Sequence, residues 1–127
     1  MERRARRLVN HGHKTSLFRI MEERDRERLT SGVFARALAG GDHLTKRLID
    51  DATWALGIAL ASAQNLLDLE AIIVGGGLGD RLGQPFVDRI VEHMTPHLFA
   101  PNRPPTVLRT ELGDLSGAVG AAVLAGG

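Results

Sequence analysis

The 127-residue sequence contains no cysteine and few aromatic residues, which are four phenylalanines and one tryptophan. The absence of cysteine excludes a disulfide framework and any thiolate metal site. With so few aromatic side chains, the core is expected to consist mostly of Leu, Ile, Val and Ala, and the 43% hydrophobic content suits a globular chain. This length allows one domain at most, or a piece of a larger one.

Long apolar runs are also missing. The longest uncharged stretch, residues 52–67, includes Thr, Ser, Gln and Asn, so it is too short and too polar to span a bilayer. The N-terminus has positive charge but no apolar run behind it, which excludes a signal peptide. We therefore expect a cytoplasmic protein that does not bind membranes.

Charge is nearly balanced overall, at +1, but it is unevenly distributed. Residues 1–28 hold nine Lys/Arg against five Asp/Glu, and the cluster Arg3, Arg4, Arg6 and Arg7 would suit a nucleic-acid patch. No aromatic residue lies among these arginines to stack on bases, and no DNA-binding motif follows. A solvated helix face is the favoured interpretation, and nucleic acid is not expected as a partner.

Apolar spacing predicts helices over residues 2–11, 16–23 and 33–39, the last ending at a Gly-Gly pair. Asp42 is then expected to cap a long central helix that runs to about residue 67. The second half of this helix has no charged residue, so we expect it to be enclosed nearly all round.

Residues 71–77, with the sequence AIIVGGG, form the most informative stretch of the chain. The uninterrupted apolar run predicts a fully buried strand. Glycines lack a Cβ, so the backbone can adopt positive φ and a ligand can lie directly against the main chain. Ligands of open α/β sheets bind at the carboxyl ends of strands. The stretch therefore indicates part of a nucleotide site, and the alternative is a tight strand-to-helix turn without a ligand.

After the glycines, an amphipathic helix is predicted from Pro85 onward, followed by a second strand over residues 106–110. Strand, helix and strand at this spacing indicate a parallel β-α-β unit. A final helix over residues 116–125 is built of Ala, Gly, Val and Leu and is expected to pack tightly. Because two strands make a poor sheet, we expect either a second copy or strands upstream of Met1 to complete it, and a homo-oligomer is the expected state.

Other polar residues suggest sites less strongly. His93 and His97 are four apart and could share a helix face, but no Glu or Asp completes a ligand set and Pro96 disturbs the helix, so no metal site is predicted. Asp114, like Asp42, is interpreted as a structural cap. The Asp80-Arg81 pair is expected to face solvent.

Four segments, in order and at matching spacing, resemble the C-terminal part of the ROK family of repressors, open reading frames and sugar kinases. They are VFARALAGGD at 33–42, LGIA and NLLD within 56–68, IIVGGGL at 72–78, and LGDLSGAVGAA at 112–122. The agreement extends from about residue 2 to the end of the chain.

The resemblance implies an α/β fold, namely the C-terminal domain of a partial actin-like ATPase (RNase H-like) architecture. Residues 1–127 would form one C-terminal part, helical over 1–70 and strand-helix-strand-helix over 71–127. Gly75, Gly76, Gly77 and Leu78 would be the cofactor-binding residues, close to the adenosine and phosphates of ATP, with Mg as the accompanying ion.

Several motifs of the family's kinases are absent. These are the N-terminal Asp-Gly phosphate loop, the Asn-Asp pair that supplies the general base, a second glycine-rich loop and the zinc motif. We therefore predict no catalytic residue and no zinc site, and we expect nucleotide to bind weakly or only with the missing N-terminal part.

The resulting hypothesis is a fragment of a ROK-type, glucokinase-like sugar kinase that uses ATP to phosphorylate a hexose. Such a fragment would form part of the nucleotide-side wall and would be inactive alone, because phosphoryl transfer requires both substrates and the metal to be positioned. The alternative is the sugar-sensing and dimerisation part of a ROK transcriptional repressor.

Overall fold

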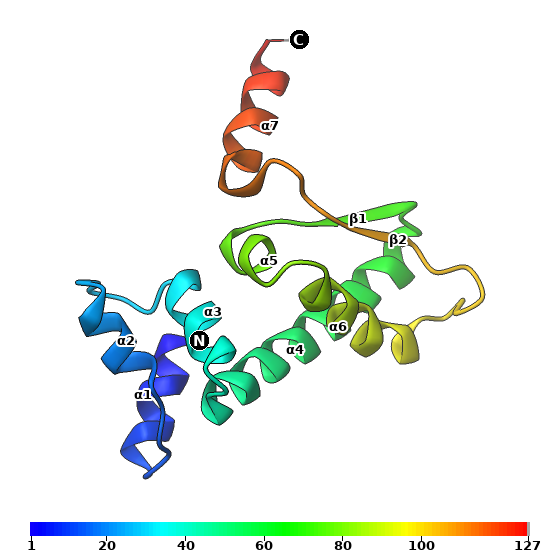
Figure 1. The fold of residues 1–127 in the computed structure, drawn as a ribbon. Helices are drawn as coiled ribbons and strands as arrows, with labels where there is room; N and C mark the ends of the chain where they lie inside the picture. Colours follow the sequence, from blue (N-terminus) through cyan, green and yellow to red (C-terminus); the bar gives the residue numbers. More distant parts are fainter. Residues whose placement is uncertain (127) are drawn as a thin grey trace.

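The computed structural model describes residues 1–126, apart from the side chains of Asp114 and Ser116. Four helices come first and a mixed segment follows (Figure 1). The helices are α1 (Glu2–Asn10), α2 (Leu17–Glu23), α3 (Ser31–Ala39) and α4 (His43–Leu67). The mixed segment contains β1 (Ala71–Val74), α5 (Gly77–Leu82), α6 (Gln84–Met94), the 3-10 helix η1 (Thr95–His97), β2 (Thr106–Arg109), the 3-10 helix η2 (Gly113–Leu115) and α7 (Ser116–Ala125). No helix among the described residues is long and apolar enough to cross a membrane.

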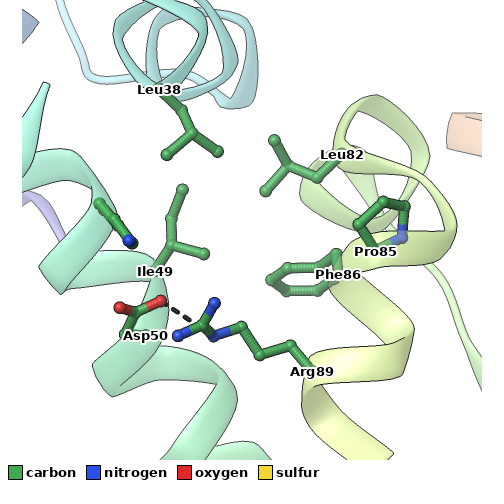
Figure 2. A pocket seen from close by; sticks show the side chains of 8 residues that line it. Leu38, Ile49, Asp50, Leu82, Pro85, Phe86 and Arg89 are labelled. Atoms are coloured by element: carbon green, nitrogen blue, oxygen red, sulfur yellow. Dashed lines mark ion pairs between the residues drawn. The ribbon is translucent and has the colours of Figure 1, made fainter. Parts of the chain in front are cut away.

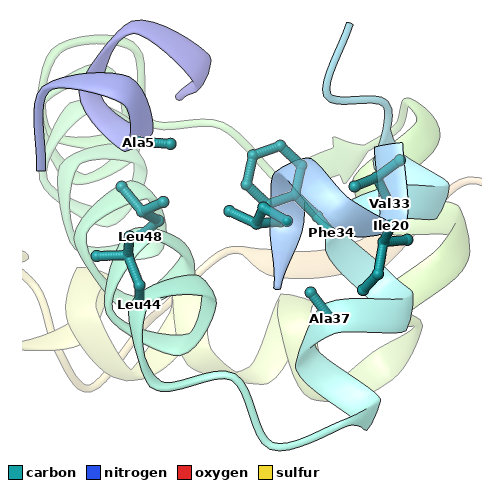
Figure 3. Close-up of a cluster of buried hydrophobic side chains, with 8 residues drawn as sticks. Ala5, Ile20, Val33, Phe34, Ala37, Leu44 and Leu48 are labelled. Carbon is teal, nitrogen blue, oxygen red and sulfur yellow. The ribbon is translucent and has the colours of Figure 1, made fainter. Parts of the chain in front are cut away.

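The first core lies where α1, α2 and α3 surround the first half of α4 (Figure 3). Its buried residues are Ala5, Leu17, Ile20, Val33, Phe34, Ala37, Leu44 and Leu48. They are mainly aliphatic, as the composition predicts. Each large side chain in such a cluster contributes about 1.5–3 kcal/mol through burial, so this cluster holds three short helices that would be marginal alone.

The Asp42 carboxylate joins two helix starts. It accepts hydrogen bonds from the Thr45 backbone N at 2.8 Å, and from the Ser16 backbone N and Oγ at 2.6 and 2.9 Å. Thr15 Oγ1 donates to it from 3.1 Å. Burial raises the pKa of Asp42, but the hydrogen bonds from Ser16 and Thr45 outweigh burial and lower it overall. The predicted cap of α4 is confirmed, and the same side chain also fixes the start of α2.

The two strands form a parallel sheet in which Ala71 pairs with Thr106 and Val74 with Arg109. The predicted parallel β-α-β unit is therefore confirmed. The prediction of a fully buried strand was wrong, because Ile72 and Val74 are buried whereas Ile73 is 68% exposed. The cause is that α4 and α6 pack on one face of the sheet only, and no described element covers the other face.

Two helices are more exposed than their sequences suggest. The second half of α4 is packed on one side by α6, so Trp54 is 54% exposed and Leu66 is 82% exposed, against the expected enclosure. Tight packing of α7 was also predicted wrongly, since Leu124 is 86% exposed and Figure 1 shows α7 projecting away from the other helices. Both helices have apolar surface that nothing in the described chain reaches.

Candidate functional site

The glycine turn connects β1 to α5 at the carboxyl end of the strand. Gly76 has φ 98°, a conformation that favours glycine, and a Cβ placed there would meet nothing within 4 Å. The turn is shorter than the sequence suggested. Gly77 already belongs to α5, because the Asp80 backbone N donates to the Gly76 carbonyl at 3.0 Å and closes the first helical turn. Leu78 lies inside this helix and its side chain packs against both neighbouring cores.

Glycine at position 75 allows a close approach to the neighbouring segment. A Cβ at this position would lie 3.3 Å from Thr110 Cγ2, tighter than most real contacts. Thr110 is buried, and its backbone N donates to the Val74 carbonyl at 3.0 Å, extending the pairing of the strands by one bond. The ends of β1 and β2 are thereby held side by side, as is typical of a ligand edge in a parallel sheet.

The segment after β2 returns to the same place. Gly113, at φ 52°, lies so close to Asp80 that a Cβ on it would be 3.5 Å from the carboxylate. Asp80 Oδ1 also lies 3.9 Å from Arg109 Nη1, an exposed pair worth at most about 1 kcal/mol. Asp80 is therefore exposed to solvent, as expected, and also contacts Arg109 and Gly113.

A further contact links α5 to the first half of the chain. Arg81 Nε donates to Ser31 Oγ at 3.2 Å, beside the start of α3. The guanidinium of Arg24 lies in the same place, since a Cβ on Gly32 would be 3.7 Å from Arg24 Nη1 and 3.6 Å from Arg81 Cζ. The two guanidinium groups therefore lie together beside the start of α3, where it meets α5.

Of the predicted cofactor residues, Gly75, Gly76 and Gly77 lie at this edge, and Leu78 turns into the core. Sequence reasoning missed that Thr110 lies against Gly75, and that Arg109 and Gly113 lie near Asp80 of α5. The only signal was the Gly113-Asp114 segment, and its proximity to α5 could not be read from one sequence. The predicted Asp114 cap falls on a side chain outside the described set.

The metal interpretation of the histidines was already disfavoured from the sequence. In the part of the chain that the structure describes, no group of three His, Asp or Glu side chains could hold a metal ion. The segment around His97 is held by Asn65. The Asn65 Nδ2 donates to the His97 carbonyl and its Oδ1 accepts from the Phe99 backbone N, both at 2.8 Å.

Helices packed on a parallel β-α-β unit, with a glycine turn at its carboxyl edge, define an α/β protein with part of an actin-like ATPase fold. The crystal structure of a candidate sugar kinase from Cytophaga hutchinsonii ATCC 33406 has the same arrangement, with a TM-score of 0.71 at 24% identity. The match covers 98% of this chain and 39% of that one.

The chain belongs to the ROK family, whose sequence profile matches residues 13–127. Curated relatives are the bifunctional enzymes NanE/NanK of Brucella melitensis biotype 1 and Brucella suis biovar 1. Each is 34% identical over 89 residues, which amount to 70% of this chain. The chain spans 16% of the length of these relatives.

Proposed function

We propose that the chain supplies the nucleotide-side wall of a cytoplasmic, ROK-type sugar kinase, glucokinase-like in using ATP with Mg to phosphorylate a hexose. The observation that carries the proposal is the open space at Gly76, on the carboxyl edge of a parallel sheet. Backbone without a side chain lets a nucleotide approach the main chain there. The kinase interpretation is preferred to the repressor because the structural neighbour is described as a sugar kinase and the Brucella relatives as enzymes.

The geometry supports a part for each residue in this proposal. Gly76 would present its main chain to the nucleotide, and Gly75 keeps the turn pressed against Thr110 so that this surface does not shift. Arg81 belongs to the short helix α5 and donates to Ser31, and its positive charge would attract a polyanion. Leu78 would hold α5 in place by packing against the two core clusters.

Catalysis is not expected of this chain alone. Hexose phosphorylation needs a general base and a cradle for the transferred phosphoryl group. Among the described side chains of the edge, the Asp80 carboxylate is paired with Arg109, 3.9 Å away, and lies against Gly113. We expect no glucose-dependent ADP formation from the chain with MgATP, and turnover above background would refute the claim of inactivity.

Nucleotide binding is tested by calorimetric titration of the chain with MgATP, comparing Gly76→Val with Gly12→Val. Gly12 is a matched control because it too has positive φ (89°) and open space around it, but it lies in the loop after α1. Both variants carry similar backbone strain, so only the loss specific to Gly76 reports on the site. Unchanged affinity in Gly76→Val would show that the glycines form a turn and nothing more.

A further inference from the structure

A half-open cavity lies away from the glycine turn, where α3, α4, α5 and α6 meet. Its volume is about 180 Å³, and its walls are mainly apolar. Figure 2 shows the side chains of Leu38, Ile49 and Leu82 pointing into the space between the helices, with Phe86 facing them. Pro85 completes this apolar wall. An apolar cavity of about 150 Å³ is enough to hold a benzene ring, so this one has room for one aromatic ring.

The apolar walls favour an aromatic group over a polar one of the same size. Phe86 offers a ring that a second ring can meet in an offset or edge-to-face arrangement. The Arg89 guanidinium, which also lines the cavity, offers a cation that can lie over a ring face. A sugar would leave its hydroxyl groups without partners against Leu38 and Ile49, which is unfavourable.

The charged residues at the rim of the cavity determine which charge the ligand should have. Arg89 Nε lies 3.0 Å from Asp50 Oδ1, so these two charges compensate each other, as the dashed line in Figure 2 marks. The third charged residue of the lining is Lys46, which is exposed and forms no ion pair within the described residues. The rim therefore has one uncompensated positive charge, which suits a ligand with a single negative charge.

We propose that this cavity binds a small aromatic monocarboxylate, with its ring between α4 and α6 and its carboxylate at the Lys46 ammonium. The site is separate from the proposed nucleotide edge, since none of the three glycines lines it. It is nevertheless connected to that edge by α5, which begins at Gly77 and contributes Leu82 to the cavity wall.

The test uses 4-fluorophenylacetate as the probe, followed by ¹⁹F NMR, and its uncharged amide as the comparison. The acid should bind about 1.5-fold to fivefold more tightly than the amide, the range expected of one exposed ion pair. Amide-proton shifts in the ¹⁵N-labelled chain should change at Ile49, Leu82 and Phe86. Absence of saturable binding, or shift changes confined to other residues, would overturn the proposal.

Two variants separate the ring from the charge. Lys46→Gln should reduce the affinity for the acid to that for its uncharged amide, and should leave the affinity for the uncharged amide unchanged. Arg47→Gln is the matched control, because it removes one positive charge from the same turn of α4 but does not line the cavity. An equal loss in both variants would mean general electrostatic attraction and would refute a specific carboxylate site.

Leu38→Trp should fill the cavity and abolish binding of both the acid and the amide. Its folding is checked by circular dichroism. A folded Leu38→Trp that still binds the amide would refute the assignment of the ring to this cavity. If this variant does not fold, the comparison between Lys46→Gln and Arg47→Gln still decides the proposal.

Discussion

The crossing of α4 and α6 at Gly57 gives the sharpest test of how this fold is packed. A Cβ at Gly57 would lie 2.7 Å from His93 Cβ and 2.9 Å from the Met94 backbone N. Carbon atoms in contact are normally about 3.5–4.0 Å apart, so Gly57→Ala would force the helices apart by about 1 Å. The atoms in the way belong to the α6 backbone and to a Cβ, which rotamer changes cannot move.

The magnitude follows from two opposing terms. Overpacking of this kind costs about 1–3 kcal/mol, and the clash with backbone places Gly57→Ala toward the upper end. Replacing glycine by alanine inside a helix returns about 1 kcal/mol. We therefore expect a net loss of about 1–2 kcal/mol in the free energy of unfolding, because separation also loosens the buried contacts of Ile90 and Met94.

Urea denaturation followed by circular dichroism measures this loss. Gly120→Ala is the matched control, since Gly120 is also helical but a Cβ there would meet nothing within 4 Å. Its stability should be unchanged or slightly raised. A Gly57→Ala variant as stable as the parent chain would refute the close crossing of α4 and α6.

The remaining predictions concern three other contacts. Asp42→Ala should lower the free energy of unfolding by about 1–2 kcal/mol through loss of the cap. Because the pKa of Asp42 is lowered from 3.8 in the folded chain, its contribution is present above about pH 3.8 and is lost as the pH falls below that value. Acid titrations of the parent chain and of a Glu92→Gln control should show this loss, and a titration of Asp42→Ala should not. Asn65→Ala should lower the free energy of unfolding by about 1–2 kcal/mol and speed hydrogen exchange at the Phe99 backbone amide. Exchange as slow as in the parent chain would contradict the hydrogen bond from this amide to Asn65. We also propose self-association through the uncovered apolar surface, so sedimentation should show oligomers that Leu124→Glu weakens, and a monodisperse monomer of the parent chain would count against this.

Local features of the sequence predicted the elements well. Strong periodicity and the Asp42 cap placed α4, and the β-branched run placed β1, because these depend on nearby residues only. α5 was not predicted, since two of its six residues are glycines and its propensity is poor. Leu78 and Leu82 hold it helical by packing into the core, which is a tertiary effect.

Burial and proximity were harder to predict for a related reason. The apolar run around Ile73 indicates that both faces of β1 favour burial, but it does not say which element covers each face. Likewise, the contact of Gly75 with Thr110 depends on the register of β1 with β2, and a parallel register is set by the packing of the crossover helix. The sequence therefore predicts the glycine turn after β1, but it does not predict that the segment after β2 packs beside it.

The uncovered surface and the candidate site are neighbours. α7 follows η2 directly, and η2 begins at Gly113, which lies against Asp80 one helical turn beyond Gly76. A contact that covers the start of α7 would therefore lie near the edge where we propose that nucleotide binds. Ordering this edge before the ligand arrives would lower the entropic cost of binding. We therefore propose that the affinity of the chain for MgATP depends on its state of assembly, through contacts made at η2 and the start of α7.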